Sequence, residues 1–455
     1  MQPSFLARFL TVDPARPALH LGRWLDYGEL RALGEGVAGW LRGEGVEPGD
    51  RVVIQLENGR DLVAAHLGCM ALGAVRVPVN AHYRAIELAP IVEDADPRLV
   101  ISAHPGLFPG RRVHARPAAG RPVRDWASPP DDVTALLFTS GTTGRPKGVP
   151  QTWAMWEANL DALSRRWHLD PEDRLHLVLP LFHTHGLVLG LHGTLLRGAS
   201  AVIGERFEPV VPAPGVTHIY GVPTFYRRWL PAMAGEPAPF RALKMMVSGS
   251  DGLPDAVWDA VRAATGHRIV ERYGMTETVM ITANPCDGER RVGTVGTPLE
   301  GVDVRVVDDE VQVRGPSVFG GYRPRPDPAA FTADGWVRTG DAGAWDPAGY
   351  LRIVGRQKDL VIVGGVNVSP AEVEAVIAGL PGVREVGVCG LPDPDLGEVV
   401  AAAVVGDISP AALEAAVAGL SGLKRPRRWA MVDTLPRNAL GKLQRGRIRT
   451  EIFGR

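Results

Sequence analysis

Short apolar runs alternate with helix-length segments along the first 285 residues of the chain. The runs at 51–56, 74–79 and 98–102 predict strands, and the segments at 61–72 and 85–95 between them predict helices. Strands separated by helix-length segments are typical of βαβ units, so a largely parallel sheet is expected. The alternation continues with predicted strands at 134–138, 175–179, 216–220 and 244–248 and predicted helices at 153–167, 186–197 and 223–233.

Residues 292–354 show a different pattern, in which short β segments such as 302–307 and 310–314 alternate with turns. This pattern predicts a β-rich subdomain. The rest of the chain has its own helix–strand alternation, with helices expected near 370–379 and 410–420, and it is long enough to form a small domain. The fold class expected is therefore α/β, with a large N-terminal domain of parallel α/β sheets, a β-rich subdomain and a small α+β C-terminal domain.

Composition narrows the functional classes. Of the 455 residues, 45% are hydrophobic and 22% are charged, as in a globular protein, and the formal net charge is −1. This balance gives no electrostatic reason to expect nucleic acid or an anionic membrane as a partner. No apolar run reaches the length of a membrane span, and the N-terminus lacks a secretory signal, so a cytoplasmic protein is expected. Cys69, Cys286 and Cys389 have no metal-binding spacing, which favours reduced thiols without a metal.

The strongest chemical signal is the glycine-rich stretch Thr139-Ser-Gly-Thr-Thr-Gly-Arg-Pro-Lys-Gly148, directly after a predicted strand. Small residues let backbone N–H groups and hydroxyls close around phosphate oxygens, and the lysine adds a positive charge. The spacing differs from the common P-loop, which needs Gly-Lys-Ser/Thr. A flexible turn is the alternative, but it does not explain the flanking strand and the embedded lysine. The candidate phosphate-binding residues are Thr139, Ser140, Gly141, Thr142, Thr143, Gly144 and Lys147.

This stretch closely resembles the phosphate loop of the adenylate-forming superfamily, which includes acyl-CoA synthetases, peptide-synthetase adenylation domains and luciferases. Other stretches resemble further motifs of the superfamily and follow its order along nearly the whole chain. They are Leu179-Pro-Leu-Phe-His-Thr-His-Gly186, Tyr273-Gly-Met-Thr-Glu277, Trp336-Val-Arg-Thr-Gly-Asp341, Gly355-Arg-Gln-Lys-Asp359, Gly364-Gly-Val-Asn-Val-Ser-Pro370 and Asn438-Ala-Leu-Gly-Lys442. The resemblance implies a ligase that activates a carboxylic acid with ATP as its acyl-adenylate and passes it to coenzyme A.

The same resemblance implies how the nucleoside part of ATP is bound. Tyr273 would stack on adenine, and Gly249 and Ser250 would line the base and acyl sites. Asp341 would accept hydrogen bonds from the ribose hydroxyls, assisted by Arg356.

For the phosphates, the resemblance implies a magnesium site and a catalytic lysine. Glu277, together with Thr142, would hold Mg²⁺, and Thr276 would bind the α-phosphate. Lys442 would stabilise charge in the transition state, which suits a point-charge ammonium.

The resemblance also divides the chain into an N-terminal adenylate-forming domain, 1–357, and a mobile C-terminal lid, 358–455. The first would bind ATP and the acid, and the second would carry the catalytic lysine and the coenzyme A side. Lys358 would be the hinge, acting through a change of backbone torsion, although it could equally be a solvated loop lysine. Gly364 and Gly365 would belong to the loop on the coenzyme A side.

Within the superfamily the chain resembles malonyl-CoA synthetases. The matching stretches are Pro180–Gly190, Gly221–Arg228, Glu271–Gly274, Asp287–Arg291 and Leu435–Lys442. A dicarboxylate must bury a second negative charge, and arginine offers a fork that matches it. The resemblance implies that Arg272 and Arg228 clamp the distal carboxylate and that His183 closes the same pocket.

Several alternatives stay open on the sequence alone. Arg227 and Arg228 are consecutive, so one of them could simply face solvent, and Arg272 could pair with Glu271. The segment 355–370 reads more like a general acyl- or aryl-CoA ligase. A ligase for malonate, methylmalonate or a larger 2-substituted malonate therefore competes with a monocarboxylate ligase and with a stand-alone adenylation protein that loads a separate acyl carrier protein. A luciferase-type oxygenase and a non-catalytic scaffold are weaker rivals.

Overall fold

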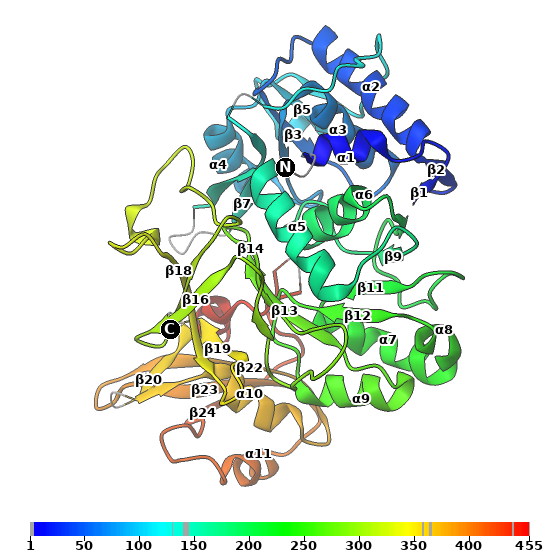
Figure 1. The fold of residues 1–455 in the computed structure, drawn as a ribbon. Coiled ribbons are helices and arrows are strands. Elements are labelled where there is room, and N and C mark those ends of the chain that lie inside the picture. Colours follow the sequence, from blue (N-terminus) through cyan, green and yellow to red (C-terminus); the bar gives the residue numbers. More distant parts are fainter. Residues whose placement is uncertain are drawn as a thin grey trace. The chain divides into compact units, whose positions relative to one another are not determined.

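The computed structural model describes residues 4–129, 131–139, 145–356, 359–363, 366–438 and 441–454 (Figure 1). The chain divides into two compact units. The first comprises Met1–Leu253, Val257–Val304 and Val313–Val337, and the second comprises Pro254–Ala256, Arg305–Gln312 and Arg338–Arg455. The domain boundary expected at residues 357 and 358 stays a prediction.

Two mainly parallel sheets form the first unit, which confirms the predicted α/β class. The smaller sheet has the order β6-β5-β3-β4-β7-β8, and its last strand runs antiparallel to β7. Val52, Val53 and Ile54 of β3 are all fully buried, as expected for a strand covered on both faces. The strands are β3 (Arg51–Gln55), β4 (Val75–Pro78), β5 (Leu99–Ser102), β6 (Val113–His114), β7 (Val133–Thr139) and β8 (Lys147–Thr152).

The larger sheet has the order β15-β14-β13-β12-β11-β9-β10-β1-β2. Its middle is parallel from β1 to β13, and antiparallel strands complete both edges. The strands are β1 (Pro17–His20), β2 (Trp24–Asp26), β9 (Arg174–Leu177), β10 (Ser200–Ile203), β11 (His218–Gly221), β12 (Met245–Ser248), β13 (Val270–Met275), β14 (Val279–Ala283) and β15 (Thr297–Pro298).

Helices flank these sheets, and one of them fixes the β13–β14 hairpin. The Asn159 side chain of α5 donates to the carbonyl of Met280 at 2.7 Å and accepts from its N–H at 3.2 Å. The helices are α1 (Phe5–Thr11), α2 (Tyr27–Gly43), α3 (Arg60–Leu72), α4 (Ala85–Ala95), α5 (Trp153–Trp167), α6 (Gly193–Leu196), α7 (Pro223–Gly235), α8 (Pro237–Arg241) and α9 (Asp255–Thr265).

The helix predicted at 186–197 is present, but its first part is a π-helix, η2 (His185–His192), which α6 continues. Two glycines let this segment lie against the strand before it. A Cβ on Gly190 would lie 2.5 Å from Leu177 Cδ1, and a Cβ on Gly186 would lie 2.3 Å from the carbonyl oxygen of Pro180. The wider π turn has no signature in the hydrophobic period, and such turns often occur at functional sites.

The rotation of α7 about its axis is set by two aromatic residues. Tyr226 and Trp229 are fully buried in a core that also contains Met246 of β12. The Tyr226 hydroxyl donates to the carbonyl of Val247 at 2.7 Å. Because these residues face inward, the consecutive Arg227 and Arg228 between them are exposed.

The second unit contains the predicted β-rich and C-terminal α+β parts. One sheet has the order β16-β17-β18-β19, and the other has the order β21-β20-β23-β22 with β24 beside β23. Valines of β20, β21, β22 and β23 form its core with α10 and α11. The elements are β16 (Asp303–Val307), β17 (Glu310–Arg314), β18 (Val337–Trp345), β19 (Leu351–Arg356), β20 (Val361–Val363), β21 (Val366–Val368), β22 (Val383–Asp393), β23 (Gly397–Gly406), β24 (Arg428–Met431), α10 (Pro370–Ala378), α11 (Pro410–Val417) and α12 (Arg445–Arg447).

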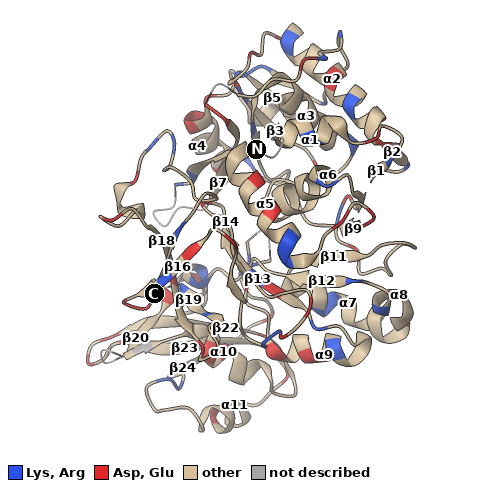
Figure 2. Cartoon of the chain, viewed as in Figure 1, with Lys and Arg blue, Asp and Glu red and all other residues tan. Residues whose placement is uncertain are grey.

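Charged residues of both signs are scattered among the helices and loops, as Figure 2 shows, in keeping with the balanced net charge of −1. None of the helices in the described part of the chain combines the length and the hydropathy that a membrane crossing needs.

Buried histidines make the first unit sensitive to acid. Burial lowers the pKa of His176, His183 and His218 to about 4, and it lowers the pKa of His66, His185 and His192 well below 6.5. Between pH 6.5 and 4 the unfolded chain therefore binds protons that the folded chain does not. The free energy of unfolding should fall as the pH drops through this window.

We expect His176→Phe to flatten that fall, because both ring nitrogens of His176 are buried without a hydrogen-bond partner. Urea unfolding followed by circular dichroism from pH 7 to pH 4 measures the slope. The matched control, His104→Phe at an exposed position, should keep the slope of the unmodified protein. A slope unchanged by His176→Phe would contradict this account.

Candidate active site

The turn between β13 and β14 carries two of the predicted site residues, Thr276 and Glu277. The hairpin closes tightly because Gly274 has no side chain. A Cβ on this glycine would lie 2.0 Å from the carbonyl oxygen of Val279. The register shifts between Tyr273 and Gly274, and Val279 has a φ of 57°. These backbone features fix where the turn places its side chains.

Glu277 is buried, with 4% of its surface exposed. The Tyr322 hydroxyl donates to its Oε1 at 2.8 Å, and the N–H of Phe319 donates to its carbonyl oxygen at 2.8 Å. A buried carboxylate is costly unless hydrogen bonds or cations compensate its charge. Carboxylate oxygen is also a preferred ligand of Mg²⁺, so Glu277 fits the metal-binding function that the sequence predicts.

Lys147, at the start of β8, faces the same tyrosine. Its ammonium lies 4.9 Å from the centroid of the Tyr322 ring and 2.6 Å from Asp327 Oδ2. The hydrogen bond from Lys147 holds the pKa of Asp327 below its ordinary value, so this carboxylate is ionised at neutral pH. Tyr322 therefore contacts both the predicted phosphate-binding lysine and the predicted metal-binding glutamate.

Hydrogen bonds to backbone carbonyls hold these segments together. The Gln151 side chain of β8 donates to the carbonyl of Thr276 at 2.6 Å and accepts from the indole N–H of Trp156 at 2.8 Å. The N–H of Arg323 donates to the carbonyl of Gly148 at 2.9 Å. The described end of the glycine-rich loop, the β13–β14 turn and the segment 319–327 thus form one cluster, which we call the phosphate cluster.

A second cluster surrounds Arg272 on β13. Arg272 has 3% of its surface exposed, and its Nη2 donates to Ser250 Oγ at 3.3 Å. Its guanidinium lies directly against Gly249, where a Cβ would be 2.4 Å from Cζ. Its Nε has no hydrogen-bond partner, and among the described residues no carboxylate pairs with it. None of the described contacts of Arg272 is to Glu271, the alternative partner named above.

Two histidines lie in the same region, and both are neutral at physiological pH. His185 Nδ1 is 3.5 Å from Ser250 Oγ, and the His185 ring stacks on Tyr220 with centroids 6.0 Å apart. Burial, reinforced by the Arg272 charge, lowers the pKa of His185 well below 6.5, and burial lowers that of His183 to about 4. Burial also lowers the pKa of Arg272 to about 9, so this residue still carries a positive charge at pH 7. We call Arg272, Ser250, His185 and Tyr220 the arginine cluster.

Arg228 is exposed on α7, and none of its described contacts reaches Arg272. Its predicted part in the clamp stays a prediction. His185 and Tyr220 were not predicted, although His185 lies two residues after the predicted His183. Tyr322 and Asp327 also escaped prediction, because they follow the recognised motifs at no fixed spacing.

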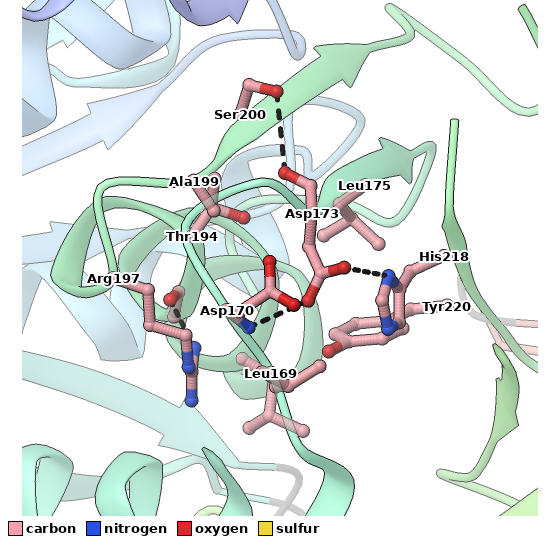
Figure 3. Close-up of a pocket in the computed structure, with 12 residues that line it drawn as sticks. Leu169, Asp170, Asp173, Leu175, Thr194, Arg197, Ala199, Ser200, His218 and Tyr220 are labelled. Carbon is pink, nitrogen blue, oxygen red and sulfur yellow. Dashed lines mark hydrogen bonds and ion pairs between the residues drawn. The ribbon is translucent and has the colours of Figure 1, made fainter. Parts of the chain in front are cut away.

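A small hollow, with Tyr220 among its lining residues, lies among α6, β9, β10 and β11 (Figure 3). It has room for about one water molecule. Its charged groups already have partners, since Asp173 lies 2.6 Å from Lys244 Nζ and Arg197 Nη2 donates to the carbonyl of Leu160 at 2.7 Å. This pairing favours a structural role for the hollow.

The second unit holds three further predicted residues. Asp341 of β18 has 5% of its surface exposed, and Arg356 Nε of β19 lies 2.9 Å from its Oδ1. These two residues stand opposite each other in the sheet. Lys442 lies in a tight turn, in which the N–H of Lys442 donates to Asn438 Oδ1 at 2.9 Å and the N–H of Asn438 donates to the carbonyl of Lys442 at 2.9 Å.

Several predicted residues lie outside the described part of the chain. They are Ser140, Gly141, Thr142, Thr143, Gly144, Lys358, Gly364 and Gly365.

Comparison with known proteins places the chain among enzymes. The model of the AMP-binding enzyme family matches residues 6–323, and that of the AMP-binding enzyme C-terminal domain matches residues 372–442. A malonate–CoA ligase of Arabidopsis thaliana is 31% identical and aligns over 90% of this chain and 79% of its own length. A feruloyl-CoA synthase of an Amycolatopsis species is 32% identical and aligns over 94% of both chains. The crystal structure of ATP-bound MatB from Rhodopseudomonas palustris is 34% identical, with a TM-score of 0.91 and 99% of both chains covered.

The arginine cluster predicts an unusual effect on stability. A buried cation without a counter-charge destabilises the folded state, so Arg272→Met should raise the free energy of unfolding by about 1–3 kcal/mol at pH 7.5 without added ligand. Urea unfolding measures it. The matched control is Arg76→Met, because Arg76 is equally buried but donates to the carbonyl of Thr134 at 3.0 Å. Arg76→Met should destabilise the protein, and an equal loss of stability in both variants would contradict the interpretation.

Proposed function

Because the chain belongs to the AMP-binding enzyme family and shares the fold of its CoA ligases, we propose that it is a Mg²⁺-dependent ligase whose acid is malonate or methylmalonate. AMP-forming acid–CoA ligation is the activity that the family supports, and its members use ATP and coenzyme A. The choice of acid rests on the arginine cluster.

The reaction has two half-reactions. A carboxylate oxygen of the acid attacks the α-phosphorus of ATP, the bond from that phosphorus to the bridging oxygen of the β-phosphate breaks, and pyrophosphate leaves. The sulfur of coenzyme A, after losing its proton, then attacks the acyl carbon, and AMP leaves with the electrons of the cleaved C–O bond. Both steps gather negative charge, so fixed positive groups and hydrogen-bond donors are what the protein must supply.

The observation that carries the acid assignment is the buried, unpaired guanidinium of Arg272. Its charge is unfavourable in the free protein, and a carboxylate would compensate it through two parallel hydrogen bonds. The Nε–H donor is suited to such a contact, since only Nη2 bonds to Ser250 and Nε is buried without a partner. A monocarboxylate would spend its one carboxylate on adenylation and leave Arg272 uncompensated.

The neighbours of Arg272 support a small, polar acid. Ser250 and His185 add hydrogen-bonding groups beside the guanidinium, and the buried His185 Nε2 has no partner. Because His185 and His183 are neutral at pH 7, Arg272 supplies the positive charge of this cluster. The single positive charge of Arg272 balances the single negative charge of a distal carboxylate.

For the phosphates we propose that Lys147 and the loop residues Thr139–Gly144 bind the triphosphate and that Thr276 binds the α-phosphate. Glu277, with Thr142, would hold Mg²⁺, and its buried carboxylate has the donor type that this ion requires. The ion would neutralise charge on the triphosphate.

The same family resemblance supports roles for the residues that would bind the nucleoside and for those of the C-terminal lid. Tyr273 would stack on adenine beside Gly249, and Asp341 would accept from the ribose hydroxyls. The ion pair with Arg356 already holds the Asp341 carboxylate in one orientation. In the C-terminal lid, proposed to pivot at Lys358, Lys442 would stabilise the transition state of adenylation, and Gly364 and Gly365 would lie on the coenzyme A side.

A monocarboxylate ligase is the second candidate. The exposure of Arg228 favours it, since the predicted two-arginine clamp would then be only half present. The similarity to a feruloyl-CoA synthase, 32% identical over 94% of both chains, points the same way. With either kind of acid, the acyl group would pass to a carrier protein instead of coenzyme A if the chain is a stand-alone adenylation protein.

The acid is tested by coenzyme A-dependent AMP release with malonate, methylmalonate, succinate, acetate, butyrate, octanoate and benzoate. We expect malonate or methylmalonate to have the highest kcat/KM. Arg272→Met should lower kcat/KM for these diacids by about 30- to 3,000-fold, because one partner of a buried charge pair is lost. The same change should leave kcat/KM for butyrate within about threefold of its value in the unmodified enzyme.

Arg228→Ala and Arg227→Ala form a matched pair in this test, since both side chains are exposed neighbours on α7. A loss confined to Arg228→Ala would support the two-arginine clamp. Preference for a monocarboxylate in the unmodified enzyme would overturn the dicarboxylate assignment and leave the ligase assignment intact.

Lys442→Ala should separate the two half-reactions. Adenylate formation, measured by isotope exchange between pyrophosphate and ATP, should fall by on the order of 100- to 1,000-fold, because a transition-state cation is removed. Thioester formation from supplied malonyl-adenylate should change far less. Lys424→Ala removes a lysine of the same unit that pairs with Glu372 at 2.7 Å, and it should affect neither step. Equal losses in both half-reactions would sink the proposed role of Lys442.

A further inference from the structure

Tyr322 joins two groups that the proposed function assigns to different tasks. Its ring faces the Lys147 ammonium at 4.9 Å, and its hydroxyl donates to Glu277 Oε1 at 2.8 Å. Tyr322 itself lies outside the motifs from which the function was inferred. The tyrosine ring thus stands between the triphosphate-binding lysine and the carboxylate proposed for Mg²⁺.

These two contacts act on different parts of the side chain. A cation over the ring face interacts with the π electrons, which phenylalanine would also supply. The hydroxyl fixes the position of the Glu277 carboxylate through a hydrogen bond to a charged acceptor, which phenylalanine cannot form. Removing the hydroxyl alone therefore separates the glutamate contact from the lysine contact.

Asp327 completes the arrangement on the other side of Lys147. Its carboxylate lies 2.6 Å from the Lys147 ammonium, and the two side chains are 35% and 26% exposed. A partly exposed ion pair of this kind contributes little to stability. A triphosphate, with several negative charges, can displace Asp327 from Lys147 at little cost.

The scaffold around these residues is fixed by ion pairs. Asp94 of α4 is nearly buried and accepts from Arg145 at 2.7 Å and from Arg325 at 3.1 Å. Burial alone would raise the pKa of Asp94, but the hydrogen bonds from these two arginines lower it, so the carboxylate is ionised. Arg323 donates to Asp131 at 2.5 Å. Asp94 therefore links the segment that carries Tyr322 and Asp327 to Arg145, at the end of the glycine-rich stretch. Asp131, just before β7, holds the same segment through Arg323.

We propose that Tyr322 and Asp327 are positioning residues of the triphosphate site. Asp327 forms an ion pair with Lys147 in the absence of nucleotide, and the Tyr322 hydroxyl orients the Glu277 carboxylate for Mg²⁺. This inference rests on the proposed function, since it presumes that ATP and Mg²⁺ bind here. It adds that nucleotide and metal binding are coupled through one phenol side chain.

The test is calorimetric titration of ATP into the full-length protein, with and without Mg²⁺. Tyr322→Phe should leave the Kd for ATP without Mg²⁺ within about twofold, because the ring remains. It should reduce the tightening caused by Mg²⁺ by about threefold to tenfold, which is the effect of one lost hydrogen bond. Tyr322→Leu, which also removes the ring, should weaken ATP binding even without Mg²⁺.

Asp327→Asn should tighten ATP binding without Mg²⁺ by about twofold to fivefold, because a competitor for Lys147 is removed. Asp131→Asn is the matched control: it breaks an aspartate–arginine pair whose arginine, Arg323, lies on the segment of Asp327, but it does not touch Lys147, and it should leave the Kd unchanged. In a Glu277→Gln background, Tyr322→Phe should have no further effect on the response to Mg²⁺.

Three results would overturn the inference: equal losses for Tyr322→Phe with and without Mg²⁺, weaker ATP binding by Asp327→Asn, or the same effect from Asp131→Asn. Thermal unfolding of each variant identifies one that fails to fold. Failure of the underlying function has a different signature, since the unmodified protein would then bind no ATP under either condition.

Discussion

The close approach of β14 to Gly274 governs the location of both candidate clusters. Arg272 precedes this glycine on β13, and Glu277 follows it in the turn. Because a Cβ at Gly274 would meet the carbonyl oxygen of Val279 at 2.0 Å, any other residue would force the hairpin apart. One short strand and its turn thus carry a cation suited to the acid and a carboxylate suited to the metal, a few residues apart. Asn159 then fixes the hairpin to α5.

Two buried arginines, Arg76 and Arg272, differ in how many neighbouring groups compensate their charge. Burial lowers the pKa of Arg76 and of Arg272 to about 9. Several groups compensate the buried charge of Arg76. It bonds to Thr134 and His192, and its guanidinium lies 5.0 Å from the ring centroids of Trp153 and of Trp156. Arg272 has one serine hydroxyl. The chain can therefore compensate a buried guanidinium fully, and at Arg272 it does not, as expected where a ligand supplies the missing partner.

The sequence predicted the parts of this protein that depend on local pattern. Alternating strand and helix signals predicted the parallel sheets, and the glycine-rich stretch predicted Lys147. It could not predict partners distant in the chain, such as Asp327, which is 180 residues from Lys147, or Tyr322, which is 45 residues from Glu277. It also missed the π turns of η2, because no side-chain period marks them. The exposure of Arg228 depends on how Tyr226 and Trp229 rotate α7, and two adjacent arginines alone do not reveal that rotation.

The contact between Gly249 and the Arg272 guanidinium bears on how acid preference can change during evolution. A side chain at 249 would overlap the guanidinium, with a Cβ only 2.4 Å from Cζ. The contacted atoms are the flexible end of the Arg272 side chain, so an enlarged residue 249 would move the guanidinium rather than the backbone. Two different substitutions therefore remove the cation from its present place, one at position 272 itself and one at position 249. Acid preference can accordingly drift in a lineage that still keeps its arginine.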